Sequence, residues 1–433
     1  MADSPSDFKP LPRRPVGANL KSVNPYLNPR VTSFLDSLEG EGEFEHFPTH
    51  EEGPEKSTEG GVIAHARENV LHFIEWVGTV IPGVALASFL AGAGKLLTDW
   101  ISIDLLGFSR SPFSAISVAI VLGLLFNNLL GLPAIYHKGL KLCLQLVLRL
   151  GIAFLGIRLS LMAAAEISLI SIPVVLGCIL AALLLVTHIN RAFGLPRRLG
   201  SLIAVGTAIC GNSAIVATAP GIGADEDEVS YAVACITIFG LITMFIYPFL
   251  AHFLFPGDAA SAGLFLGTAV HDTAQVTGAG LMYAQQYGSP EALDTAVVTK
   301  LVRNLCMVWV IPVMAILYHR SDAQGASGKT PKWYKLVPFF VVGFVLMTMV
   351  RTIGDIGERP FGFLEADAWQ SAVSMIAYFA TWCLTIAMAA VGLGTSFGKL
   401  RKLGWKPVTV GFSAAALVGV VSFTLIKVVR AVT

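Results

Sequence analysis

Two polar, glycine-containing segments carry the residue types that can bind a small solute. Residues 206–214 read GTAICGNSA, and residues 267–275 read GTAVHDTAQ. Their hydrogen-bonding side chains are those of Thr207, Asn212, Ser213, Thr268, His271, Asp272 and Gln275. Because glycine weakens a helix, each segment is expected to interrupt one. Polar, glycine-broken segments in two corresponding positions are typical of transporter binding sites.

A helix that breaks inside a membrane exposes backbone N–H groups where its second half begins. Such N-termini carry partial positive charge and suit an anion. Irregular backbone at membrane depth is tolerated only where it lines a cavity or is buried in protein. The two segments therefore predict a hydrogen-bonding site near the middle of the membrane.

Asp272 is the sharpest candidate for a functional residue. A carboxylate at membrane depth costs about 2.5–3.5 kcal/mol even on permissive scales, so such a residue is usually functional. We expect Asp272 to bind and release a coupling proton. His271 could share that proton, because imidazole titrates near neutral pH. The structural alternatives are an ion pair or a helix cap for Asp272 and a packing role for His271.

Lys300, Arg303 and Asn304 lie on the next apolar segment. Their spacing of three and four residues places them on one face of a helix. Two cations at membrane depth need partners, and Asp272 or an anionic substrate would serve. The alternative is that both side chains extend to the membrane surface.

The elements that must position these residues are transmembrane helices. Of the 433 residues, 54% are hydrophobic and only 14% are charged, against about 25% charged in an average soluble domain. A helix needs about 20 apolar residues to cross the bilayer. We predict spans near 73–97, 113–132, 140–163, 168–189, 199–220, 229–254, 262–286, 294–317, 336–351, 370–397 and 407–429. The fold class is an all-α polytopic membrane protein of about 10–11 helices, two of them broken or re-entrant.

Charge distribution predicts the domains and their orientation. Residues 1–68 are polar, lack the apolar stretch of a signal peptide, and are predicted to form a disordered cytoplasmic tail, with residues 69–433 as the transporter domain. Lysine and arginine gather in alternate connections, such as the one with Arg197 and Arg198. Basic connections face the cytoplasm. We therefore expect a cytoplasmic-membrane protein with a cytoplasmic N-terminus and an external C-terminus.

An internal repeat is visible around the two polar segments. Each is followed by an apolar stretch with the same spacing, Ala232 to Pro248 and Ala296 to Pro312. If the polar segments cross the membrane, the two units are parallel. If they enter and return as hairpins, the units are inverted. The charge rule gives the same ends in both cases and leaves the choice open.

Several function classes have no support in the sequence. The net charge is +1, so nothing points to nucleic acid. The six cysteines all lie in apolar segments without a CxxC pair, and no nucleotide, metalloprotease or hydrolase motif occurs. We expect neither an enzyme nor a cofactor or metal.

Several motifs resemble one family. They are the segment 206–214, Phe239-Gly240 with Tyr247-Pro248, the segment 271–276, Lys300 with Arg303, and the segment 387–393. In this order the chain resembles the YeiH-like family of bacterial membrane proteins, over about residues 70–430. The resemblance implies sulfate export and a distant likeness to the cation/proton antiporter and bile-acid symporter group. The family commonly has His-Glu where this chain has His271-Asp272.

The function expected is a secondary transporter for a small anion of the sulfate, sulfite or sulfonate class. It would export the anion with proton or ion coupling, within a lipid bilayer and in a form compatible with a homodimer. One alternative is a cation/proton antiporter, in which Asp272 binds the cation and Lys300 competes with it. An alternative of another class is a membrane sensor or scaffold, which would move no solute.

Overall fold

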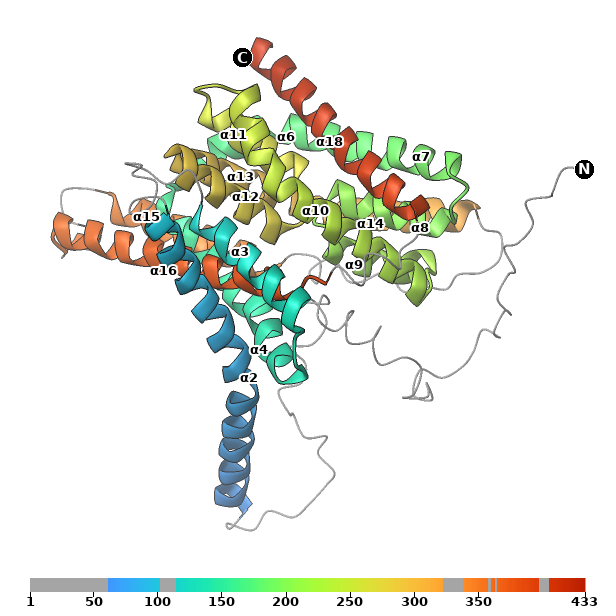
Figure 1. Cartoon of the computed structure of the whole chain (residues 1–433). Coiled ribbons are helices and arrows are strands. Elements are labelled where there is room, and N and C mark those ends of the chain that lie inside the picture. Colours follow the sequence, from blue (N-terminus) through green and yellow to red (C-terminus); the bar gives the residue numbers. More distant parts are fainter. Residues whose placement is uncertain are drawn as a thin grey trace, which may run out of the picture.

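The computed structural model describes residues 61–101, 114–321, 338–356, 360–362, 364–396 and 405–432, and within these ranges the regular structure is helical (Figure 1). Seven helices are long and apolar enough to cross a membrane: Trp76–Asp99, Ala134–Arg158, Leu161–Ala192, Glu228–Leu254, Pro290–Tyr318, Ala366–Gly394 and Lys406–Ala431. Shorter apolar helices cover Ala115–Leu130, Ala259–Ala269 and Phe339–Gly354. The chain is a multi-pass, all-α membrane protein.

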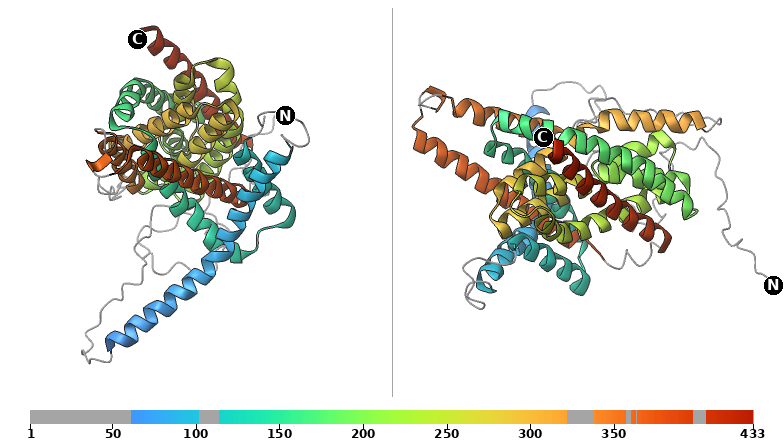
Figure 2. Two further views of the ribbon diagram at one scale, coloured as in Figure 1. Left: turned by 90° about the vertical axis from the view of Figure 1, so that its left-hand side faces the viewer. Right: turned by 90° about the horizontal axis from the view of Figure 1, so that it is seen from above.

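The helices form two bundles. The first bundle contains α2 (Gly61–Asp99), α3 (Ala115–Leu125), α4 (His137–Leu142), α5 (Leu148–Leu155), α15 (Phe339–Gly354) and α16 (Ala366–Gly394). Glycines let its helices touch, because a methyl group at Gly123 would overlap the backbone of α16. The N-terminal end of α2 projects beyond the other helices (Figure 1, Figure 2).

The second group of helices is called the hairpin bundle here. It contains α6 (Leu161–Ala181), α7 (Thr187–Ala192), α8 (Arg197–Ala208), α9 (Asn212–Ile222), α10 (Glu226–Leu254), α11 (Ala259–Ala269), α12 (Thr273–Tyr287), α13 (Pro290–Leu305), α14 (Met307–Ser321) and α18 (Trp405–Val432). Side-chain caps start several of these helices, as where Ser160 accepts from Ala163 N and Asp258 accepts from Ser261 N.

Helices α8 and α9 fold back on each other as a hairpin, residues 197–222, called hairpin 1. A methyl group at Gly206 would lie 2.8 Å from Ile215, whereas nine residues of continuous helix would separate them by about 13.5 Å. Both ends of hairpin 1 lie beside the end of α14, where the Arg197 guanidinium lies 4.9 Å from the Tyr318 ring. Its tip lies at the start of α14, with Cys210 Sγ 3.1 Å from Met307 Sδ.

Helices α11 and α12 form a second hairpin, residues 259–287, called hairpin 2. Gly263 packs on Ala292 and Gly267 on Ala296, so α11 runs parallel to α13. In contrast, Gly280 packs on Leu293 whereas Thr273 lies at the far end of α13, so α12 runs antiparallel to α13. Both ends of hairpin 2 therefore lie beside the start of α13.

The two hairpins enter from opposite ends of the α13–α14 pair, and their tips meet between these helices. Helix α10 runs parallel to α12, because Gly240 packs on Gln275 and the His252 and Tyr287 rings stack at 3.7 Å. It is thus antiparallel to α13, so the two repeated units are inverted. The structure selects the hairpin arrangement that the sequence left open.

Two predicted boundaries differ from the structure. Helix α2 begins at Gly61, so residues 61–68 are helical and not part of a polar tail, while residues 1–60 of that predicted tail lie outside the described residues. The predicted span 294–317 is interrupted at Cys306, where α13 ends before α14 begins. Each of the remaining predicted spans overlaps a helix or a hairpin, with boundaries that differ by up to seven residues, as where α6 begins at Leu161 and the predicted span begins at 168.

Candidate substrate site

The tip of hairpin 1 turns on a glycine. Gly211 has a φ of 75°, a conformation that residues with a side chain rarely adopt. A methyl group there would also lie 3.1 Å from Asp272 Oδ2, so the glycine allows the two tips to approach. Helix α9 begins at Asn212 without a side-chain cap, in the part of the chain that the structure describes. Its first N–H groups are thus available to a ligand.

The tip of hairpin 2 is capped by its own carboxylate. Asp272 Oδ1 accepts from Ala274 N at 2.8 Å, and Gln275 Oε1 accepts from Asp272 N at 3.2 Å. This reciprocal pair is a capping box. Of the structural alternatives for Asp272, the helix cap is therefore present. The second carboxylate oxygen faces Gly211 and remains directed at the other tip.

Lys300 joins the two tips. Its side chain is fully buried, and Nζ donates to Ile209 O at 2.8 Å, to Val270 O at 3.2 Å and to His271 O. These carbonyls lie at the ends of α8 and α11. Lys300 therefore does not extend to the membrane surface, and its hydrogen bonds go to backbone oxygens of both hairpins.

Arg303 acts on the same two helix ends. Its fully buried guanidinium donates to Ala208 O at 2.6 Å and to Thr207 O in hairpin 1, and to Thr268 O at 2.6 Å in hairpin 2. A helix C-terminus carries partial negative charge. The two cations of α13 thus offset the negative ends of α8 and α11 and hold the tips together.

The other predicted residues divide between the tips and their surroundings. The Thr268 hydroxyl bonds back to Leu264 O at 2.7 Å and lies 2.6 Å from Ser422 Oγ on α18, so it packs away from the other tip. Asn304 Nδ2 donates to Thr273 Oγ1 at 3.1 Å, at the start of α12. Ser213 is partly buried beside Asn212.

Two of the buried polar side chains with unmet hydrogen-bonding capacity belong to the tip segments. The Thr207 hydroxyl and both ring nitrogens of His271 have no partner among the described residues, although both side chains are fully buried. Buried polar groups are nearly always paired. Both belong to the tip segments, so these groups favour a water or ligand there.

Thr237 on α10 is a site residue that sequence reasoning missed. Asn212 Nδ2 donates to Thr237 Oγ1 at 3.2 Å, and Gln275 Nε2 donates to Thr237 O at 3.1 Å. Thr237 therefore contacts both tips. The signal available in the sequence was one of two threonines within the apolar span 229–254, three residues before Gly240.

The joined tips carry excess positive charge. The segments 206–214 and 267–275 contain one carboxylate, Asp272, whereas two buried cations, Lys300 and Arg303, donate to the carbonyls of the same segments. The partial charges of the two helix C-termini and the two N-termini offset each other. A net positive charge in a low-dielectric setting attracts an anion strongly.

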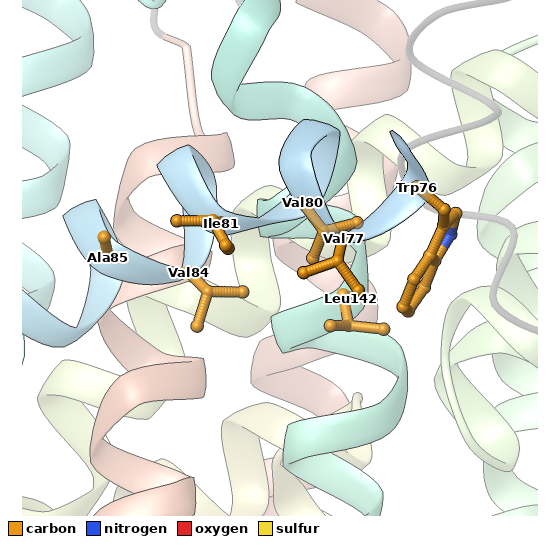
Figure 3. Close-up of a pocket in the computed structure, with 7 residues that line it drawn as sticks. All are labelled: Trp76, Val77, Val80, Ile81, Val84, Ala85 and Leu142. Carbon is orange, nitrogen blue, oxygen red and sulfur yellow. The ribbon is translucent and has the colours of Figure 1, made fainter. Parts of the chain in front are cut away.

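An apolar groove elsewhere shares no residue with the tips. It lies along one face of α2 and is lined by Trp76, Val77, Val80, Ile81, Val84, Ala85 and Leu142 (Figure 3). Such a lining suits hydrocarbon and offers no charged group to an ion.

The comparisons with known proteins agree on one family. The family model described as "Conserved hypothetical protein 698" matches residues 82–411. A UPF0324 membrane protein of Agrobacterium fabrum is 30% identical over 83% of this chain and 96% of its own length. One from Streptococcus agalactiae is 30% identical over 80% and 96%, and one from Bordetella pertussis is 32% identical over 76% and 89%. No solved structure matches the chain. The chain therefore belongs to this family of UPF0324 membrane proteins, the YeiH-like family that its motifs resemble.

Proposed function

We propose that this protein is a secondary transporter that moves a small anion of the sulfate, sulfite or sulfonate class, and that it is not an enzyme. The observation that carries the proposal is the meeting of two buried cations with one carboxylate where two inverted hairpins join. Inverted repeats with broken helices at mid-membrane are a recurring transporter architecture.

Charge balance supplies a coupling mechanism. With Asp272 ionised, Lys300 and Arg303 leave one unit of positive charge at the tips. A proton on Asp272 raises this by one unit, so a dianion binds more favourably to the protonated site. Because linkage is reciprocal, the anion in turn favours the proton. Asp272 would thus couple proton and anion binding, with His271 beside it as a second proton acceptor.

The hairpins give the site two separate routes of access. Hairpin 1 reaches the site from the end of α14, and hairpin 2 reaches it from the start of α13. Movement of one hairpin at a time would expose the anion to one side of the membrane. The basic connections support a cytoplasmic entrance at the hairpin 1 end, near Arg197. The same rule places the N-terminus inside and the C-terminus outside, in the cytoplasmic membrane. Export is the direction that the family resemblance implies.

The test is flux of labelled sulfate and sulfite in proteoliposomes under an imposed pH gradient. We expect gradient-dependent flux in the native protein and its loss in Asp272→Asn, which keeps a capping side chain but carries no proton. Asp258→Asn is the matched control, because Asp258 pairs with Arg430 away from the tips. Cation-dependent proton release without any anion requirement would replace this proposal with a cation/proton antiporter. Absence of any flux from folded protein would leave a sensor or scaffold.

A further inference from the structure

We propose that Thr237 is a positioning residue for the anion, which fixes the amide of Asn212 at the tip of hairpin 1 and ties it to the cap of hairpin 2. The inference rests on the proposed anion transport and deepens it. It names a residue on α10, outside both polar segments, and assigns it an effect on substrate binding.

The side chain of Thr237 makes the link to hairpin 1. Its Oγ1 accepts from Asn212 Nδ2 at 3.2 Å and donates to Asn212 Oδ1 at 3.4 Å. An amide group has two N–H donors and one oxygen acceptor. Since the hydroxyl occupies the oxygen and one donor, Asn212 has one N–H that no described residue accepts and that is left for a further acceptor. The tip therefore presents a donor beside the uncapped start of α9, which suits an anion and not a cation.

The backbone of Thr237 makes the link to hairpin 2. Its carbonyl oxygen accepts from Gln275 Nε2 at 3.1 Å, while Gln275 Oε1 accepts from the N–H of Asp272. The Gln275 amide is thus held at both ends. Gly240, one turn after Thr237, packs directly against the Gln275 amide, since a methyl group at Gly240 would overlap that amide. Asn212 and Asp272 are in this way held in fixed relation by one residue.

The two links can be separated by mutation. Thr237→Val removes the hydroxyl but keeps the shape and the carbonyl, so it frees Asn212 and leaves Gln275 bound. Thr237→Ser keeps the hydroxyl. If the hydroxyl acts only through Asn212, then Asn212→Ala should raise KM at least as much, because it also removes the N–H proposed to face the anion, and the double variant should be no worse than Asn212→Ala alone.

The experiment measures KM and maximal rate of sulfate flux for the full chain in proteoliposomes. We expect Thr237→Val to raise KM about fivefold, because the loss of one ordinary hydrogen bond weakens binding by about that factor. The maximal rate should change less than twofold. Thr237→Ser should behave as native protein, and Thr237→Val with Asn212→Ala should match Asn212→Ala alone. Melting temperatures confirm folding, and Thr237→Ala serves if the valine variant does not fold.

Three results would overturn the inference while leaving anion transport in place. They are an unchanged KM in Thr237→Val and Thr237→Ala, an equal loss in Thr237→Ser, or effects that multiply in the double variant. Native protein that moves no anion would instead overturn the proposed function, and this inference with it.

Discussion

The two hairpins share a sequence pattern and an inverted position, yet they differ at one equivalent residue. Five residues after the glycine that opens each tip segment, hairpin 1 has Gly211 and hairpin 2 has Asp272. Asp272 caps the helix that follows it, while Gly211 leaves the start of α9 without a side-chain cap in the described structure. The difference indicates a division of labour. In the proposed transporter, hairpin 2 would carry the group that holds a proton, and hairpin 1 would supply the donors for the anion.

The C-termini of the first half-helices, α8 and α11, are stabilised in the same way in both hairpins. Lys300 and Arg303 each donate to carbonyls from both hairpins, at the C-termini of α8 and α11. The two repeats are therefore alike at the C-termini of α8 and α11, where Lys300 and Arg303 hold the hairpins together. They differ at the starts of α9 and α12.

Arg303→Ala should have the largest effect, because both hairpins lose their common donor. Several buried carbonyls would lose their partner, each at a cost of about 1–3 kcal/mol. We expect a large fall in melting temperature or failure to fold, measured on purified protein. Arg430→Ala is the control, since Arg430 is half exposed and pairs with Asp258 at the surface. Equal stability of the two variants would contradict the role given to Arg303.

Gly211→Asp converts the tip of hairpin 1 toward that of hairpin 2, and it should abolish anion binding. The new carboxylate would stand beside Asp272 and cancel the positive charge at the start of α9. Gly211→Asn carries the same backbone strain and nearly the same volume without the charge. We expect sulfate affinity, measured by calorimetry, to fall at least tenfold further in the aspartate variant. Equal sulfate affinities in the two variants would contradict an electrostatic role for the start of α9.

Gly240→Ala tests the cap of hairpin 2 without touching its carboxylate. The added methyl group must displace the Gln275 amide, so the capping box should loosen. We expect a loss of about 1–3 kcal/mol in stability, with faster amide hydrogen exchange at the start of α12 and little change in α9. Exchange that increases equally in both helices would show that the tips are not separately held.

Asp294→Asn should have the smallest effect. Asp294 on α13 pairs with Arg158 of the first bundle at 3.2 Å, with side chains 13% and 21% exposed, close to the open ends of hairpin 2. The pair is partly screened, so we expect a loss of about 1 kcal/mol in a double-mutant cycle with Arg158→Ala. A coupling energy near zero would show that this ion pair does not anchor hairpin 2 to the first bundle.

The sequence predicted the two helix breaks because the polarity of these segments is unusual in apolar surroundings. The breaks at 209–211 and 270–272 fall within the two segments named in advance, and Lys300 and Arg303 lie between the tips. Their partners could not be predicted, since backbone carbonyls leave no mark on a sequence. The hairpin arrangement could not be predicted either, because crossing and returning segments give the same alternation of basic connections.

Thr237 was missed for a different physical reason. A threonine within an apolar span usually bonds to a carbonyl of its own helix, as Thr243 of the same helix does with Gly240 O at 2.9 Å. Nothing in the local sequence tells such a residue from one that faces another element. The packing of α10 against both tips brings its hydroxyl to Asn212.

The most direct test of the central claim is the number of protons taken up when the native protein binds sulfate. Calorimetry in buffers of different ionisation enthalpy gives this number, and Asp272→Asn is measured alongside. We predict uptake approaching one proton per anion in the native protein at a pH where Asp272 is ionised. The variant should bind sulfate with no proton uptake, because the amide stays neutral. Sulfate binding without proton uptake in the native protein, or the same uptake in the variant, would contradict the account.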